Sequence, residues 1–316
     1  MRSNQSLFKS VQYLIILFFT SAFAAQAQTP ADAIMMKPGE FCGGIFYNNG
    51  TSTEYWEGDS LRTHTNAGTI TRHTISAGFV VGIVKNLDFY FNLPYMIITP
   101  SAGEVAGETG IQDVSFAVKY QLLDKEVGPG KFKALVSASF ATPASDYVPE
   151  AAFALGAGCP YGVGRGVLAY RANMGLYGKL QAGYHLRGNS NLVRTYYYTD
   201  TEAYNSNEID MTDAVDYSFT VGYVTESLSF KVEAEYGMFN TIGGFDIRNW
   251  DGGFPTNDVE KSYIGGHIQY IPSFAKGLGI HLLPSYTLDG RNTAKVFNIG
   301  GGVTYLVNLW NKEASE

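Results

Sequence analysis

Residues 228–236 read Leu-Ser-Phe-Lys-Val-Glu-Ala-Glu-Tyr, and this stretch decides the fold. Apolar and polar residues alternate along it, and successive side chains of a β-strand point to opposite faces of the sheet. One face would therefore be largely apolar, while the other would carry the charged side chains. The same alternation recurs in residues 87–93, 114–122 and 215–223, and again near the end of the chain. Because helical periodicity appears nowhere after the first 28 residues, the sequence predicts an all-β protein.

The composition of the 316-residue chain fits many short strands. Charged residues make up 16% of the chain, against roughly 25% in typical soluble proteins. Glycine (36), tyrosine (22) and phenylalanine (20) are abundant. A mean hydropathy of −0.06 and an apolar content of 45% exclude a disordered chain and a helical membrane protein. The net charge of −7 argues against nucleic acid as a partner, because neutralising phosphates takes a basic face.

The first 27 residues have the features of a secretory signal peptide. Two cations, an apolar stretch over 11–19 and a small-residue cleavage site at 25–27 follow one another. The apolar stretch is too short to span a bilayer, and no later hydrophobic run approaches 18 residues. We therefore expect a signal peptide over 1–27, a short lead over 28–39 and export from a bacterial cytoplasm.

The alternating runs place about twelve strands in the mature chain. Their expected bounds are 40–56, 64–84, 87–99, 111–123, 132–142, 163–173, 176–187, 213–224, 228–242, 259–271, 278–287 and 295–310. The connections after even-numbered strands are short, whereas those after odd-numbered strands are mostly long and polar. Outer-membrane barrels show this asymmetry and a secreted β-sandwich has no reason to. We therefore expect a transmembrane antiparallel up-and-down β-barrel over 40–310, followed by a polar tail over 311–316.

The cost of charge in lipid indicates which face of each strand turns inward. A Lys or Arg on the lipid face at mid-membrane costs roughly 2–4 kcal/mol. The expected inward charges are those of Lys119, Lys231, Glu233 and Glu235. Lys119 would then be the counter-charge to the two glutamates across the barrel. Outer-membrane lipid would contact the apolar faces, and Trp310 would anchor the last strand at the interface. Twelve strands enclose little space, so we expect a narrow, partly plugged lumen.

Three neighbouring segments within residues 65–145 resemble a known family. Residues 86–95 read NLDFYFNLPY, 110–123 read GIQDVSFAVKYQLL and 132–143 read FKALVSASFATP. This order resembles the outer-membrane family named for the meta-cleavage pathway of phenol degradation. The resemblance implies an outer-membrane channel or transporter for hydrophobic or aromatic molecules. The matching positions are Pro94, Gly110, Asp113, Lys119 and Tyr120.

Two of these positions are candidate lumen residues, and both also have purely structural explanations. Asp113 opens a strand after a loop, where its carboxylate can accept backbone N–H bonds. Lys119 faces inward in the middle of a strand, where a carboxylate across the lumen can pair with it.

The sequence carries no motif for catalysis, metals or cofactors. No histidine is followed two positions later by the serine that a barrel lipase would need. His281 and Ser285 would lie about 13 Å apart on one strand face, too far for a hydrogen bond. We therefore expect no enzyme, no catalytic or cofactor-binding residue and no metal site. Cys42 and Cys159 could pair in an oxidising periplasm or remain small apolar residues, and the sequence leaves both open.

The longest expected loop, 188–212, contains Tyr196, Tyr197 and Tyr198. Tyrosine offers amphipathic contact area, so this loop could cap the pore, bind a ligand outside or simply extend a hairpin. The sequence thus predicts an outer-membrane barrel that passes small molecules. The alternative is a surface barrel whose loops bind a partner, and an outer-membrane hydrolase is the weakest alternative. The solute and the oligomeric state stay open.

Overall fold

The computed structural model describes residues 29–103, 106–149, 154–198, 202–244, 257–275 and 277–310. The expected signal peptide, the polar tail over 311–316 and most of the connection over 243–258 lie outside these residues. Within the described part of the chain, no helix is long and apolar enough to cross a membrane.

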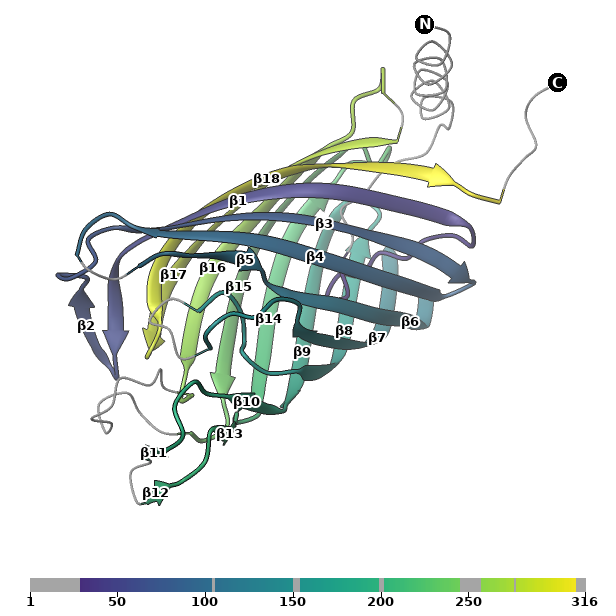
Figure 1. The fold of residues 1–316 in the computed structure, drawn as a ribbon. Helices are drawn as coiled ribbons and strands as arrows, with labels where there is room; N and C mark the ends of the chain where they lie inside the picture. Colours follow the sequence, from purple (N-terminus) through teal and green to yellow (C-terminus); the bar gives the residue numbers. More distant parts are fainter. Residues whose placement is uncertain are drawn as a thin grey trace, which may run out of the picture.

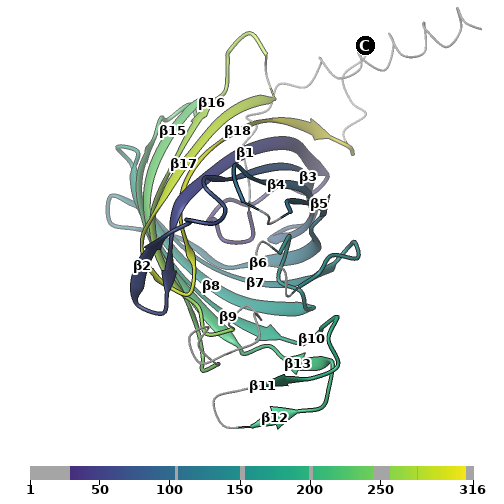
Figure 2. The same cartoon turned by 60° about the vertical axis from the view of Figure 1, so that its left-hand side comes forward.

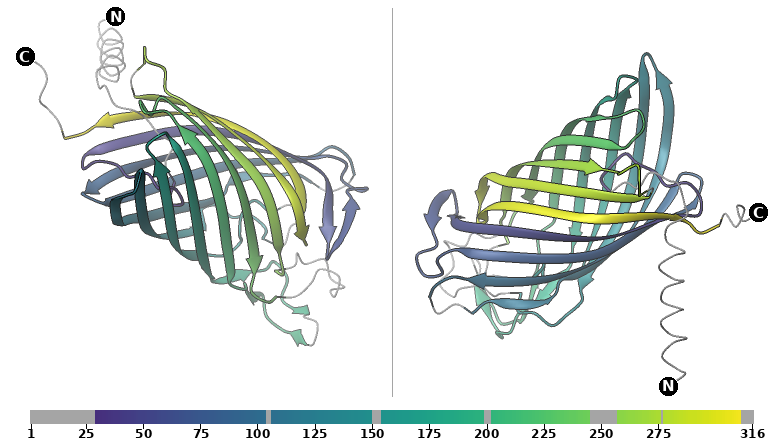
Figure 3. Two further views of the ribbon diagram at one scale, coloured as in Figure 1. Left: turned by 180° about the vertical axis from the view of Figure 1, so that it is seen from behind. Right: turned by 90° about the horizontal axis from the view of Figure 1, so that it is seen from above.

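Twelve long antiparallel strands form one closed barrel (Figure 1). They are β1 (Glu40–Glu57), β3 (Ile70–Val84), β4 (Leu87–Pro100), β6 (Asp113–Val127), β7 (Gly130–Pro143), β8 (Tyr161–Ala172), β9 (Leu176–Arg187), β14 (Ala214–Val224), β15 (Phe230–Thr241), β16 (Glu260–Tyr270), β17 (Leu278–Arg291) and β18 (Ala294–Asn308). Each pairs with the next of these strands, and β18 closes the ring by pairing with β1. Figure 3 shows the teal-to-yellow strands of the rear wall side by side in chain order. The prediction of a twelve-stranded barrel is confirmed.

In the described part of the chain, six further short strands lie outside this ring of twelve. They are β2 (Ser60–Thr63), β5 (Glu108–Ile111), β10 (Asn189–Asn191), β11 (Tyr197–Tyr198), β12 (Ala203–Tyr204) and β13 (Glu208–Asp210). β2 folds back on the end of β1, and β5 pairs with the end of β4. β10 pairs with β13 and β11 with β12, so the connection between β9 and β14 is a hairpin that extends away from the barrel (Figure 1).

Some predicted bounds were wrong at strand ends, where turn geometry overrides the alternation. Leu228 belongs to a turn and not to β15, because its φ of 57° is left-handed and its N–H donates to the Thr225 carbonyl. The predicted strand over 64–84 begins only at Ile70, after a turn that includes Gly68. The strand predicted to end at residue 287 continues to Arg291, which leaves a connection of two residues before β18.

The two ends of the barrel differ in their connections. One end, called the turn end below, carries the short connections 85–86, 128–129, 173–175 and 225–229. The other end, called the loop end, carries most of the long ones, including the hairpin between β9 and β14.

The two faces of the wall differ in chemistry. Large apolar side chains such as Ile45, Phe116, Phe219 and Ile264 are exposed on the outer face. The pairing register carries the alternation around the ring, so alternate residues of every strand share the inner face. The buried inner surface holds polar and charged groups such as Lys119 and Gln269. The wall is thus apolar outside and polar inside.

The lead enters the barrel at the turn end. Figure 2 shows this segment, in purple, within the ring of strands. Met36 packs inside against a cluster of buried side chains from the surrounding strands, namely Cys42, Val80, Tyr90, Ala117 and Leu306. At Gly39 the chain leaves the lumen and turns into β1, with a left-handed φ of 81°. A Cβ on Gly39 would lie 2.6 Å from the Trp310 ring, so the close approach also requires glycine.

Candidate functional site

The lead is fixed in the lumen by a buried ion pair at the turn end. The Nζ of Lys119 lies 2.7 Å from Oδ1 of Asp32, and the Lys119 side chain is 0% exposed. The same ammonium group donates to the carbonyl of Thr29 at 3.1 Å. The carboxylate of Asp88, on the neighbouring strand, accepts the Met36 N–H at 3.1 Å. A charge buried this deeply needs such partners, because an unpaired buried charge is strongly destabilising.

Two further lysines hold the lead by its backbone. The ammonium of Lys133 donates to the Ala33 carbonyl at 3.3 Å, and that of Lys179 donates to the Ala31 carbonyl at 3.2 Å. Together with Lys119, these donors come from β6, β7 and β9. These three lysines therefore hold the lead from the β6–β9 part of the wall, and residues 29–36 are not part of the sheet.

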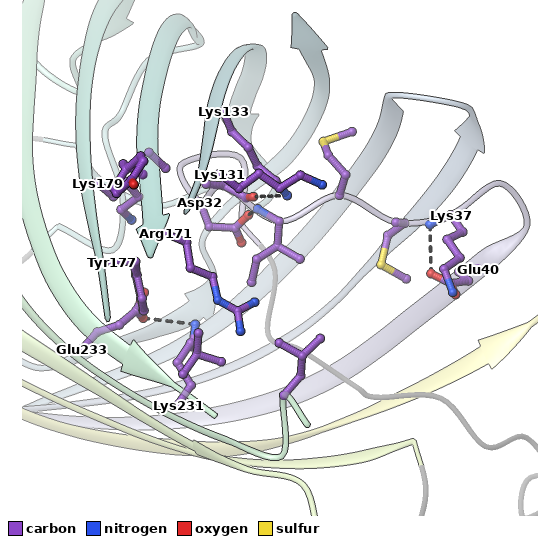
Figure 4. Close-up of a pocket in the computed structure, with 18 of the residues that line it drawn as sticks. Asp32, Lys37, Glu40, Lys131, Lys133, Arg171, Tyr177, Lys179, Lys231 and Glu233 are labelled. Carbon is purple, nitrogen blue, oxygen red and sulfur yellow. Dashed lines mark hydrogen bonds and ion pairs between the residues drawn. The ribbon is translucent and has the colours of Figure 1, made fainter. Parts of the chain in front are cut away.

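A cavity of about 430 Å³ lies beside the lead (Figure 4). Its walls come from the lead, from β1, β7, β8, β9, β14, β15 and β18, and from the turn between β14 and β15. Its basic lining residues are Lys37, Lys131, Lys133, Arg171, Lys179 and Lys231. Arg171 extends into the space between Asp32 and Lys231 (Figure 4). The volume falls in the range of small-molecule sites, about 300–1,000 Å³.

The inward charges of β15 begin a chain of polar contacts across four strands. Lys231 Nζ lies 3.1 Å from Glu233 Oε2, which also lies 3.0 Å from Nδ1 of His267. His267 Nε2 lies 3.1 Å from His281 Nδ1, and His281 Nε2 lies 2.9 Å from the hydroxyl of Thr304. Every ring nitrogen in this chain has a polar neighbour, so the two histidines are oriented from both sides.

Glu235 has its own set of partners, further towards the loop end of the lumen. Its carboxylate accepts bonds from the hydroxyls of Thr220 and Tyr263, each at 2.9 Å, and lies 3.8 Å from Lys179 Nζ. The expectation that Lys119 is the counter-charge of the two glutamates is wrong. Asp32 of the lead pairs with Lys119 instead, and nearer cations serve the two glutamates.

A second cluster spans the lumen wall towards the loop end. Asp216 Oδ2 lies 2.6 Å from both Arg165 Nη2 and His185 Nε2. Its other oxygen accepts a bond of 2.7 Å from the Gln181 amide. These residues come from β8, β9 and β14, so the cluster ties three neighbouring strands together. The sequence prediction missed it, because glycines blur the alternation around Arg165 and nothing local marks its partner.

Asp113 lies at the loop end, where it fixes the connection between β7 and β8. It accepts the hydroxyl of Tyr147 at 2.5 Å and the N–H of Ala157 at 2.9 Å. Burial raises the pKa of the Tyr147 hydroxyl, which therefore stays protonated and donates. The structure thus places Asp113 beneath a loop at the mouth, away from the inward stripe of β15.

The three predicted loop tyrosines lie in the hairpin between β9 and β14. Tyr197 is buried against Leu192 and Ile209, and its ring stacks on Tyr204 with centroids 5.0 Å apart. Tyr196 is 55% exposed. Tyr198 pairs through its backbone with Ala203. Tyr197 therefore holds the hairpin together.

The remaining candidates stay apart in space. Cys42 and Cys159 are buried and form no disulfide, and they lie apart, Cys42 on β1 at the turn end and Cys159 before β8 at the loop end. His281 contacts His267 and Thr304, whereas the hydroxyl of Ser285 accepts a bond from the Asn298 amide. In the described ranges, no group of three or more His, Cys, Asp and Glu side chains could hold a metal ion.

Among solved structures, the barrel is similar to an outer-membrane channel from Pseudomonas putida F1. The TM-score is 0.70 at 11% identity, over 89% of this chain and 100% of that chain. Two other solved barrels are more distant. The NanC porin has a TM-score of 0.44 at 10% identity, over 83% of this chain and 98% of that chain. The translocator domain of the autotransporter NalP from Neisseria meningitidis has a TM-score of 0.43 at 12% identity, over 87% of this chain and 90% of that chain. No family model and no curated protein matches the sequence. This chain thus has the fold of an outer-membrane channel, and its resemblance to the phenol-degradation family stays a prediction.

Proposed function

We propose that this protein is a channel in the bacterial outer membrane that passes small molecules through its lumen. The observation that carries the proposal is the contrast between the two faces of the closed wall. Its outer face presents large apolar side chains, and its inner face holds ion pairs around a cavity. A barrel with this arrangement suits lipid outside and a polar route inside.

The proposal orients the molecule in the membrane. Barrels of this kind have short periplasmic turns and longer extracellular loops. The turn end, with the lead inside it, would therefore face the periplasm, and the hairpin of β10 to β13 would face outward. Trp310 is exposed at the turn end, where an indole suits the periplasmic interface.

The lead narrows the route at the periplasmic side. It is held by three ammonium groups and one buried carboxylate, and its residues 29–36 belong to no strand. A segment outside the strand pairing can leave without breaking the sheet. We propose that the lead is a constriction that sets how fast solutes pass.

The solute class belongs to the same proposal. The resemblance to the phenol-degradation family supports hydrophobic or aromatic molecules. The inner wall adds charged groups such as Arg171, Lys231 and Glu233, which support solutes that also carry a polar or charged group.

Single-channel conductance of the refolded protein in a planar bilayer tests this function. We expect discrete conductance steps, and we expect the mature protein in the outer-membrane fraction, migrating differently on gels when unheated. Recovery of the mature protein as a soluble periplasmic protein would contradict the membrane assignment. A folded barrel that does not conduct, even after its lead is removed, would contradict the channel assignment.

A second candidate function is binding of a partner by the extended hairpin. Val193 and Tyr196 are 74% and 55% exposed on this hairpin, which reaches beyond the barrel (Figure 2). Exposed apolar groups on a built hairpin suit a contact surface. Deleting residues 195–205 should abolish surface binding but leave conductance unchanged if this candidate is correct.

A further inference from the structure

The cavity beside the lead has cations without acid partners. Lys133 donates only to the Ala33 carbonyl, and Arg171 makes one long contact of 3.5 Å with the Thr225 carbonyl. Among the described residues, no carboxylate lies within ion-pair distance of either side chain. Both nevertheless line a partly open cavity inside the barrel, where the field of an unpaired charge is screened less than at the outer surface.

The acids of the same cavity are already engaged. Asp32 pairs with Lys119 at 2.7 Å, and Glu233 pairs with Lys231 and contacts His267. Glu40 accepts the Lys37 N–H at 2.9 Å. The cavity therefore carries an excess of positive charge, although the whole chain has a net charge of −7.

Apolar side chains complete the lining. Ile34 and Met35 of the lead face the cavity, as do Val224 and Leu228 near the turn between β14 and β15. Small-molecule sites combine such apolar walls with a few placed polar groups. This cavity offers both, with the guanidinium of Arg171 as a fork that fits a carboxylate.

We propose that this cavity binds a small organic anion, a monocarboxylate with an apolar body. The carboxylate takes the place opposite Arg171 and Lys133, and the apolar body contacts Ile34, Met35 and Leu228. The inference deepens the proposed function and rests on it for its meaning, because it names the class of solute that the channel would pass.

A second pair of cations marks the route from the loop end. Arg72 lies near the start of β3 and Lys261 near the start of β16, both at the loop end of their strands. Lys261 lies 5.6 Å from the centroid of the Tyr263 ring. In the described part of the chain, neither cation has a carboxylate within ion-pair distance. An anion entering from the loop end would thus meet unpaired positive charge before it reaches the cavity.

Calorimetric titration of the refolded full-length mature protein in detergent tests the site, with hexanoate as the probe. Hexanamide has the same body without the charge, hexylammonium has the opposite charge, and acetate lacks the apolar body. Because charge-assisted bonds are about twice as strong as neutral ones, we expect hexanoate to bind at least about tenfold more tightly than hexanamide. Acetate and hexylammonium should bind more weakly than hexanoate, and micelles without protein provide the blank.

Substitution of the unpaired cations locates the binding. Arg171→Gln should weaken hexanoate binding about tenfold, since a bidentate charged contact is lost. Lys133→Gln is the second variant if Arg171→Gln fails to fold. Lys85→Gln removes the same charge from the exposed turn between β3 and β4 and should leave the affinity unchanged. Folding of each variant is checked by its unheated migration on a gel.

The outcomes separate this inference from the proposed function. Equal binding of hexanoate and hexanamide, no binding to a folded protein, or tighter binding of hexylammonium would each overturn the anion site. Hexanoate binding in detergent by a barrel that never conducts would overturn the channel and leave the site. Conductance without hexanoate binding would overturn the anion site and leave the channel.

Discussion

The two ends of the lumen use similar ion pairs for different purposes. At the turn end, Lys119 pairs with Asp32, which belongs to a lead outside the sheet. Towards the loop end, Arg165 and His185 pair with Asp216, and all three belong to wall strands. An ion pair therefore fixes strands to each other at one end and holds a segment outside the sheet at the other. This difference predicts that matched substitutions at the two ends change different properties.

Removal of the lead should have the largest effect on passage. A variant without residues 29–38 keeps every barrel strand but loses the segment inside the lumen. Because the width of a pore limits its flow, we expect single-channel conductance to rise several-fold. Asp32→Asn, which weakens the pair with Lys119 but keeps the lead, should give a smaller rise. Conductance equal to that of the intact protein in a folded variant would show that the lead does not limit passage.

Asp216→Ala should have the largest effect on stability. It leaves Arg165 and His185 without their carboxylate inside the wall, which costs about 3 kcal/mol when a buried pair is broken. We expect a lower urea midpoint for loss of the folded gel band and no several-fold change of conductance. The matched control is Asp59→Ala, since Asp59 is 73% exposed in its pair with Arg291 and such pairs contribute about 1 kcal/mol or less. Equal destabilisation by both variants would contradict the comparison.

Neutralising the glutamates between the two ends should change selectivity and should lower stability less than Asp216→Ala, because a glutamine side chain can still accept hydrogen bonds. Glu233→Gln combined with Glu235→Gln removes two negative charges from the inner face of β15 and leaves Lys179 and Lys231. Charge inside a narrow pore sets the local potential, so the reversal potential in a salt gradient should shift towards anions. An unchanged reversal potential in a conducting barrel would place both glutamates off the solute route.

Tyr197→Ala should have the smallest effect on the barrel. The Tyr197 ring stabilises the hairpin through Leu192, Ile209 and Tyr204, all beyond the strands of the wall. We expect faster protease cleavage within 188–212, while the urea midpoint of the barrel changes by an amount equivalent to about 0.5 kcal/mol or less. Loss of the folded gel band would mean that the hairpin and the wall are one cooperative unit.

The wall could be predicted from the sequence because alternation is a local property. The alternation over 230–236 needs only neighbouring residues to show that Phe230 and Lys231 face opposite ways. The inner pairs depend on residues that the fold brings together, such as Lys119 and Asp32, which are 87 positions apart. The lead has no strand alternation, so nothing in the sequence placed it in the lumen. Leu228 shows where alternation alone misleads, because it lies in a turn although its apolar side chain continues the alternation of the strand that follows.

The position of Gly39 has a consequence for the order of folding. The seam between β1 and β18 joins opposite ends of the chain, as in the pairing of Glu40 with Asn308. Strands that are far apart in the sequence pair slowly, because bringing the two ends of a long chain segment together costs conformational entropy. The lead is attached to β1 at Gly39, so it can lie against the inner face of a still-open sheet before the seam forms. We expect the barrel to wrap around its own lead, with no need for the lead to thread into a finished ring.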